Sequence, residues 1–235
     1  MKTIQKIPLF ILIFIPILAN TQGLTSLTGA GTRHDIETWL KKNQLRSYNE
    51  NSSVLGEKYL FEDWREGNVI TAEGLTLRGI SIKYDLLEAY LILRVNDTHA
   101  LLDAKGIEEF EIINGQNTLS FRSVEFGGKK HFVQDLFNGK TIALLKKHSV
   151  RLERKDPGNQ AYGSGVAYDE YVSKKEYFVM KDKAQIIPIK PSKRVLVKLF
   201  KDQEEKIKAY IKKNSLDLKE DNDLGELFEY YENIN

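Results

Sequence analysis

Histidine and cysteine would provide the most reactive side chains, since histidine serves as a metal ligand and general base near neutral pH. The four histidines lie far apart, without the H-x-H, HExxH or H-x3-H spacing of a metal site: His34, His99, His131 and His148. The chain has no cysteine, which excludes thiolates and disulfides. We expect ordinary polar histidines, with no metal and no cofactor; strands that bring distant histidines together remain the alternative.

Two motifs of small residues suggest catalysis or phosphate binding only at first sight. Ser164 lies between two glycines, but a nucleophile elbow needs the pattern G-x-S-x-G. Tyr162 and Val166 occupy the positions where its glycines would stand. Gly29-Ala30-Gly31 precedes no strand–helix unit that could hold a phosphate. We expect neither motif to form a site.

Carboxylates could act as an acid–base pair, as they do in glycosidases, where two of them face each other across a cleft. Six acidic residues lie at expected strand ends or turns: Glu62, Asp63, Asp85, Asp135, Asp169 and Glu170. A hydrolase that uses such residues, with Asp63, Asp85 and Asp135 to be tested first, is therefore one hypothesis. The simpler explanation is that strand-end acids are solvated, so no catalytic residue is assigned.

A basic cluster lies near the first helix expected in the C-terminal part: Lys190, Lys193, Arg194, Lys198 and Lys201. It indicates a solvated face or a contact surface for an acidic partner. The chain as a whole has 35 basic and 33 acidic residues, and the first 23 residues contain two of the lysines and no acid. The remainder is formally neutral, so we expect no nucleic-acid partner.

Residues 1–23 have the pattern of a secretory signal peptide. Lys2 and Lys6 precede an apolar run from Ile7 to Ala19, which is shorter than the roughly 20 apolar residues of a membrane-spanning helix. We expect cleavage between Ala19 and Leu24, with membrane contact only if the signal peptide stays uncleaved. The exported protein would be periplasmic, cell-surface or secreted, with residues 24–34 as a flexible lead-in.

The β-rich region is expected at residues 56–189, where short β-branched and aromatic runs alternate with Gly, Asn and Asp. The apolar alternation changes phase at Arg78-Gly79, which indicates a bulge. The run 89–95 is apolar on both faces, so both should be covered. We predict strands near 59–61, 68–72, 75–84, 88–95, 99–103, 107–113, 119–126, 131–137, 141–145, 148–154, 171–180 and 184–189, and a surface loop at 156–165.

Helices are expected on both sides of this region. A short amphipathic helix is predicted at 35–45. In the helical appendage, 192–235, Ser192 should cap a helix that ends at Phe200, a second helix should run from Asp202 to Asn214, and Asn222 or Asp223 should cap a third. The predicted fold is a single α+β domain over 35–235: a curved, half-barrel-like antiparallel β-meander with a short N-terminal helix and C-terminal helices.

Three groups of residues carry a family resemblance. The groups are Gly56 to Phe61 with Trp64, Gly67, Val69, Gly74 and Lys83-Tyr84-Asp85; Asn138-Gly139-Lys140 with Ala143 to Lys147; and Tyr210 to Asn214 with Asp223-Leu224 and Tyr230-Tyr231. With these soft aromatic, glycine and turn motifs, most of the mature chain resembles exported proteins of unknown function from Bacteroidetes bacteria. The resemblance implies a bacterial envelope setting and supplies no catalytic residue.

Three functions are compatible with these features. The first is a non-catalytic envelope protein that binds another macromolecule or has an organising role, since no reactive constellation is present. The second is a binder of lipids or other apolar ligands on the concave face of the sheet, suggested by the doubly apolar run 89–95. The third is the hydrolase described above.

Overall fold

The computed structural model describes residues 38–39, 54–95, 98–156, 159–160, 163–164, 167–182 and 184–235. The expected signal peptide and lead-in lie outside these residues. Of the helix expected at 35–45, only Thr38 and Trp39 are described, and both are helical. Within the described ranges, no helix has the length and apolar character needed to cross a membrane.

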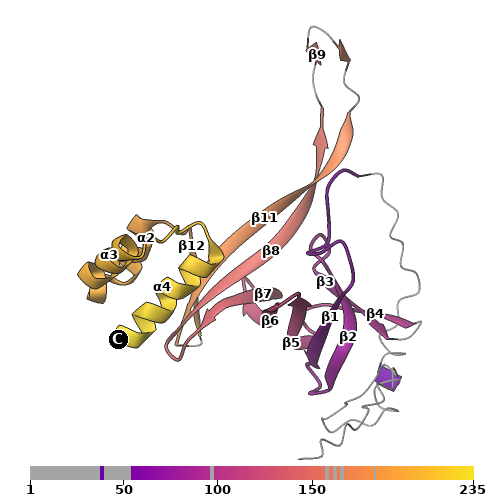
Figure 1. The fold of residues 1–235 in the computed structure, drawn as a ribbon. Helices are drawn as coiled ribbons and strands as arrows, with labels where there is room; N and C mark the ends of the chain where they lie inside the picture. Colours follow the sequence, from indigo (N-terminus) through magenta and orange to yellow (C-terminus); the bar gives the residue numbers. More distant parts are fainter. Residues whose placement is uncertain are drawn as a thin grey trace, which may run out of the picture.

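Ten strands form one open antiparallel sheet (Figure 1). Their order across the sheet is β12-β11-β8-β7-β6-β5-β1-β2-β3-β4. In chain order the strands are β1 Arg65–Thr71, β2 Thr76–Asp85, β3 Tyr90–Val95, β4 Thr98–Leu102, β5 Ile107–Asn114, β6 Asn117–Phe126, β7 Lys129–Asn138, β8 Ile142–Lys155, β11 Tyr168–Lys181 and β12 Gln185–Ile189. Two short strands, β9 (Asn159–Gln160) and β10 (Gly163–Ser164), pair separately within the predicted loop.

The predicted antiparallel, β-rich fold with C-terminal helices is confirmed, but the connectivity is not a simple meander. Strand β1 lies between β2 and β5, because β5 returns past β3 and β4 to pair with it. Gly67 permits this pairing, since a Cβ atom there would lie 2.0 Å from the backbone oxygen of Glu111.

The runs predicted near 141–145 and 148–154 form one strand, β8, and at 59–61 only Tyr59 forms an isolated bridge.

The predicted bulge at Arg78-Gly79 is confirmed. Gly67 pairs with Ile80 and Val69 pairs with Leu77, so β2 has one more residue than β1 between these pairs. Gly79 has a φ of +61°, a left-handed conformation that glycine adopts without a steric penalty. The bulge therefore explains why the apolar alternation changes phase in the sequence.

The curved lobe (β1–β7) curls around an aromatic cluster, Tyr84, Phe110, Phe121 and Phe132, all nearly fully buried. Strands β2 and β7 are four strand spacings apart, about 19 Å in a flat sheet. Yet the ring centroids of Tyr84 and Phe132 are 5.6 Å apart, and Phe110 stacks on Phe121 at 4.6 Å. The sheet therefore curls until its own side chains fill the concave side.

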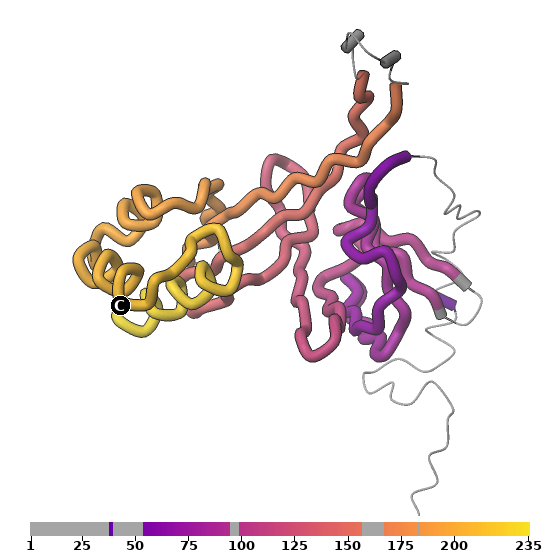
Figure 2. The backbone as a smooth tube through the Cα atoms, turned by 45° about the horizontal axis from the view of Figure 1, so that its top comes forward, coloured from indigo at the N-terminus to yellow at the C-terminus, as the bar shows by residue number. Residues whose placement is uncertain are grey.

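Strands β8 and β11 form a long two-stranded ribbon (Figures 1 and 2). The ribbon contributes side chains both to the core of the curved lobe and to the core beneath the C-terminal helices. Val150 and Tyr171, in the middle of the ribbon, pack against the core of the curved lobe. The backbone amide of Val150 donates to the oxygen of Leu86 at 3.1 Å, just beyond the end of β2. Beyond these contacts the ribbon projects from the body.

The helical lobe consists of α2 (Lys193–Leu199), the 3₁₀ turn η1 (Lys201–Gln203), α3 (Glu204–Lys213) and α4 (Asp221–Ile234) against one face of β7, β8 and β11. Its core includes Leu144, Val179, Phe200, Leu227 and Phe228, all fully or nearly fully buried. A smaller cluster that includes Val133, Leu145 and Phe178 covers the opposite face of the same strands.

Two helix caps test the sequence predictions. Ser192 caps α2 as predicted, since its Oγ accepts from the amide of Val195 at 3.4 Å. The prediction for α4 is wrong, because the helix begins at Asp221 and Asn222 and Asp223 lie inside its first turn. Asp223 instead accepts from the amide of Asp217 at 2.6 Å, so it holds the preceding link against the helix.

Candidate functional site

Three of the strand-end acids that could form a hydrolase site have a local partner, whereas Glu62 and Asp63 are exposed. Asp85 is buried, pairs with Lys58 at 3.1 Å and accepts the amides of Leu87 and Glu88 at 2.9 and 3.0 Å. Asp169 lies 3.4 Å from Arg154, and Glu170 lies 3.8 Å from Lys155. These contacts make turns and cross-strand pairs, as expected for structural acids.

The described histidines lie in separate surroundings. The His99 ring lies 5.6 Å from that of Trp64, and the His131 ring lies 4.3 Å from that of Phe126. His148 contacts Gln134, as described below, and His34 lies outside the described residues. Within the described chain, no group of three His, Cys, Asp or Glu side chains could hold a metal ion. Ser164 lies in the short strand β10.

The predicted basic cluster gathers around a groove between α2 and α3. Its lining includes Lys193, Arg194 and Lys198 from α2 and Lys201 from η1, and its volume is about 720 Å³. The structure adds Lys208 from α3, whose place at the groove cannot be read from sequence spacing because it lies on the next helix. Lys190 is not part of the lining. We call this feature the basic groove.

The charge of the basic groove is largely unbalanced. Glu204 is the only acidic residue of its lining, and it pairs with Lys208 at 2.5 Å. No ion pair in the described chain uses Lys193, Arg194, Lys198 or Lys201. Val197 adds a mostly buried apolar side chain to the lining. The groove therefore combines a cationic rim with apolar surface from Val197 and the lysine methylenes.

A second group of polar residues lies between the two cores, and we call it the polar seam: Gln134, Lys146, His148, Tyr177 and Asp221. Four alternate residues of β8 share one face of the strand: Leu144, Lys146, His148 and Val150. Leu144 belongs to the helical core and Val150 to the curved core, so Lys146 and His148 lie between the two cores. Lys146 is only 3% exposed, and its ammonium pairs with Asp221 at the start of α4. The hydroxyl of Tyr177 donates to the same carboxylate at 3.0 Å.

His148 and Gln134 complete the polar seam on the side of the curved core. The Nε2 atom of His148 lies 2.7 Å from Oε1 of Gln134, and its ring centroid lies 6.1 Å from that of Phe121. Burial, followed by the nearby Lys146 ammonium, lowers the pKa of His148 to about 4. The imidazole is therefore neutral at neutral pH, and a proton on Nε2 is donated to the Oε1 atom of Gln134.

Asp135 lies beside the seam at a bulge of β7. It pairs with Arg122 at 2.6 Å, yet burial outweighs this attraction and raises the pKa of Asp135 above its usual value. Its Oδ1 atom is buried without a well-aligned hydrogen bond. Asp135 is thus a predicted acid that lines a cleft and has a perturbed environment.

That cleft opens between the two lobes and has a volume of about 580 Å³. One side comes from the β5–β6 turn and β6, the floor from β7, and the other side from α4. Its lining residues are Gln116, Asn117, Thr118, Leu119, Gln134, Asp135, Leu136, Phe137, Asp221, Asn222, Gly225, Glu226 and Glu229. We call it the interlobe cleft.

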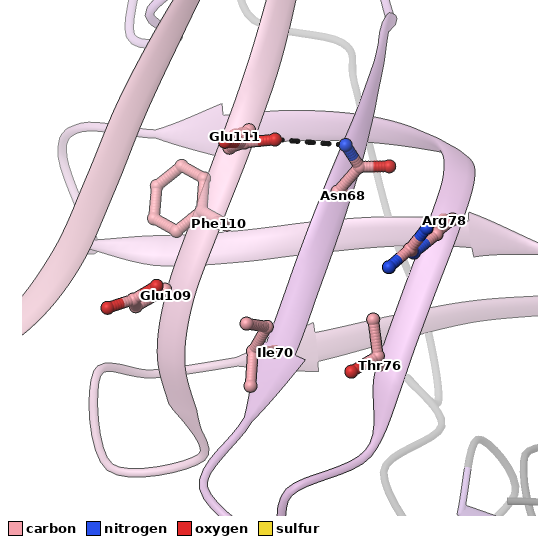
Figure 3. A pocket seen from close by; sticks show the side chains of 7 residues that line it. All are labelled: Asn68, Ile70, Thr76, Arg78, Glu109, Phe110 and Glu111. Atoms are coloured by element: carbon pink, nitrogen blue, oxygen red, sulfur yellow. Dashed lines mark hydrogen bonds between the residues drawn. The ribbon is translucent and has the colours of Figure 1, made fainter. Parts of the chain in front are cut away.

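A smaller groove of about 350 Å³ lies over β5, β1 and β2 (Figure 3). Its polar groups make hydrogen bonds around the bulge. The side chain of Asn68 donates to Glu111 at 3.0 Å and accepts from the backbone amide of Gly79 at 3.2 Å. Arg78 and Glu109 border it, and Phe110 of the aromatic cluster contributes to its lining. We assign this groove a structural role, because its central amide is already satisfied on both sides.

The chain was compared with family models, curated proteins and solved structures. None of the three comparisons gives a match. Any assignment of function therefore depends on the geometry of the basic groove, the polar seam and the interlobe cleft.

Proposed function

We propose that this chain is a non-catalytic exported protein of a bacterial envelope, whose helical lobe binds an acidic segment of another protein in the basic groove. The single observation that carries this proposal is the set of four unpaired cations at the groove: Lys193, Arg194, Lys198 and Lys201. Four like charges brought together on two short helices repel one another, and an acidic partner would relieve that repulsion.

The apolar surface inside the cationic rim favours a peptide partner. Val197 and the lysine methylenes would contact apolar side chains, and the ammonium and guanidinium groups would pair with flanking carboxylates. The pattern resembles helix-in-groove recognition, in which an amphipathic segment lies between two helices. The signal-peptide pattern of residues 1–23 supports the exported setting.

The two alternative functions have weaker support. An apolar-ligand binder needs space on the concave face, yet the aromatic cluster fills that side with rings such as Phe110 and Phe132, whose centroids lie 5.1 Å apart. A hydrolase needs an activated pair, yet Asp85 and Asp169 are engaged in separate local pairs. Asp135 lines the interlobe cleft, but it is ion-paired with Arg122.

Binding of the purified protein to immobilised poly-L-glutamate tests the proposal. The test variant carries Lys193→Gln, Arg194→Gln, Lys198→Gln and Lys201→Gln. The matched control removes four exposed lysines elsewhere: Lys105→Gln, Lys129→Gln, Lys130→Gln and Lys219→Gln. Both variants lose the same net charge, so a difference between them reports the groove and not the overall charge.

We expect the wild type and the control to bind poly-L-glutamate at 10 mM salt and the groove variant to bind at least tenfold more weakly. Binding should also weaken as salt shortens the Debye length from about 30 Å at 0.01 M to about 8 Å at 0.15 M. Equal losses in the two variants would contradict the proposal. So would binding to a sulfated polysaccharide in the absence of binding to poly-L-glutamate.

A further inference from the structure

The interlobe cleft is a cavity separate from the basic groove. Its side chains differ in charge and hydrogen-bonding character from those of the groove, so it suits a different kind of ligand. It lies where the curved lobe meets α4, and ligand sites occur preferentially at such boundaries between packed units. Its volume of about 580 Å³ falls within the roughly 300–1,000 Å³ of small-ligand pockets. The polar seam lies directly behind it, because Gln134 and Asp221 belong to both.

The polar groups of the cleft are amides and carboxylates. Amide side chains, which both donate and accept hydrogen bonds, come from the β5–β6 turn, β6, β7 and α4. Carboxylates, which only accept, come from β7 and α4. The amides are Gln116, Asn117, Gln134 and Asn222, and the carboxylates are Asp135, Asp221, Glu226 and Glu229. No lysine or arginine is among the lining residues. Asp135 and Asp221 are already paired with Arg122 and Lys146, so an anionic ligand would meet the carboxylates of Glu226 and Glu229 without a cation in the lining.

Several of these groups are held in place before any ligand arrives. Gln134 is buried and fixed by His148, and Asp221 is fixed by Lys146 and Tyr177. Such support from neighbouring residues is what a binding site needs to present its polar groups in one geometry. The cleft is thus lined in part by groups with restricted freedom.

Gly225 and three half-buried apolar side chains shape the rest of the cleft. A Cβ atom on Gly225 would lie 3.0 Å from the backbone oxygen of Leu136, so glycine lets α4 approach β7 closely. Leu119, Leu136 and Phe137 add apolar surface to the lining. The cleft therefore offers apolar contact next to groups that accept and donate hydrogen bonds.

We propose that the interlobe cleft binds a neutral glycan segment. Sugar hydroxyls donate to carboxylates such as Glu229 and accept from amides such as Asn117, so one ligand can satisfy both kinds of group. The apolar face of a sugar ring fits against the half-buried apolar side chains. A polyamine would satisfy the carboxylates but would leave the amide donors without acceptors.

Titration calorimetry with cellohexaose and with chitohexaose tests the proposal on the full, purified protein. The test variant carries Asn117→Ala and Glu229→Ala, two exposed residues from opposite sides of the cleft. The matched control carries Asn233→Ala and Glu57→Ala, which are exposed outside it. Far-UV circular dichroism verifies that both variants remain folded, and poly-L-glutamate binding should be unchanged in both.

We expect at least one hexasaccharide to bind the wild type and the control, with at least tenfold weaker binding to the cleft variant. In two-dimensional NMR of the wild type, the ligand should shift the amide signals of Gly225 and Asn117. The proposal is overturned if neither hexasaccharide binds at millimolar concentration, if the variant binds as well as the control, or if the shifts map elsewhere. Binding of spermine in place of the sugars would also overturn it.

Discussion

The curved lobe and the helical lobe are both tightly packed, but their cores are built in different ways. The curved core brings together rings from strands β2, β5, β6 and β7, so it exists only when the sheet curls. The helical core places aliphatic and aromatic side chains of α2, α3 and α4 on strands that already belong to the sheet. We therefore expect the helices to depend on the sheet, and we expect strands β1–β5 not to depend on the helices.

The polar seam marks the boundary between these two modes of packing. Lys146 and His148 continue the buried face of β8, but they carry polar groups where both neighbours on that face are apolar. Asp221 ties the start of α4 to the strand, because its removal would leave the Lys146 ammonium buried and unpaired. This difference leads to three tests of the dependence between the lobes.

The largest effect is expected from Phe110→Ala in the curved core. Removal of a fully buried ring costs about 4 kcal/mol of unfolding free energy. Because strands of the curved lobe support the helices, urea unfolding should show both lobes lost in one transition. Ile113→Ala, an exposed site on the same strand, is the control and should change stability by less than about 1 kcal/mol.

A smaller and more local effect is expected from Leu227→Ala in α4. Loss of this buried side chain should destabilise the helical lobe by about 3 kcal/mol. In native-state hydrogen exchange, the amides of α2, α3 and α4 should lose protection while those of β1 and β5 retain theirs. Equal loss of protection in β1 and β5 would show that the two lobes are mutually dependent.

The smallest effect is a pH dependence that originates in the polar seam. The folded protein holds the pKa of His148 at about 4, below its ordinary value of 6.5. As the pH falls from 6.5 towards 4, His148 of the unfolded chain binds a proton that the folded chain excludes. The contribution of His148 to the unfolding free energy is therefore complete above pH 6.5 and decreases below it. This change should amount to roughly 2 kcal/mol.

The variant His148→Gln isolates this contribution when urea unfolding is measured at pH 7 and pH 4.5. It should lose less stability than the wild type between these values. His131→Gln is a necessary comparison, because burial and the nearby Lys147 also lower the pKa of His131. The raised pKa of Asp135 acts in the opposite direction and is present in all three proteins. An unchanged slope in His148→Gln would remove His148 as the cause.

Local signals explain which parts of the fold could be predicted from the sequence. Ser192 stands before an apolar helical pattern, and Arg78-Gly79 interrupts an alternating one, so each feature lies within a few residues. The position of β1 between β5 and β2 could not be predicted, because it depends on a backbone contact between Gly67 and Glu111. Pairing across the sheet is a non-local property.

The same distinction applies to the candidate sites. Most of the basic groove comes from one helix and its following turn, which is why four of its cations were identified from the sequence. The polar seam and interlobe cleft join residues far apart, such as Lys146 and Asp221, which are 75 positions apart. One signal was available: Lys146 shares the strand face of Ile142 and Leu144, where a charged residue implies a buried partner.

The shared ribbon has a mechanical consequence. Strands β8 and β11 are each 14 residues long and are paired along their whole length, with the helical lobe packed on one end and the curved lobe in contact near the middle. A pull that separates the lobes along the ribbon axis would load many backbone hydrogen bonds at once, in parallel. A pull that opens the ribbon from its projecting tip would break them one after another. The molecule should therefore resist stretching along the ribbon far better than peeling from its tip.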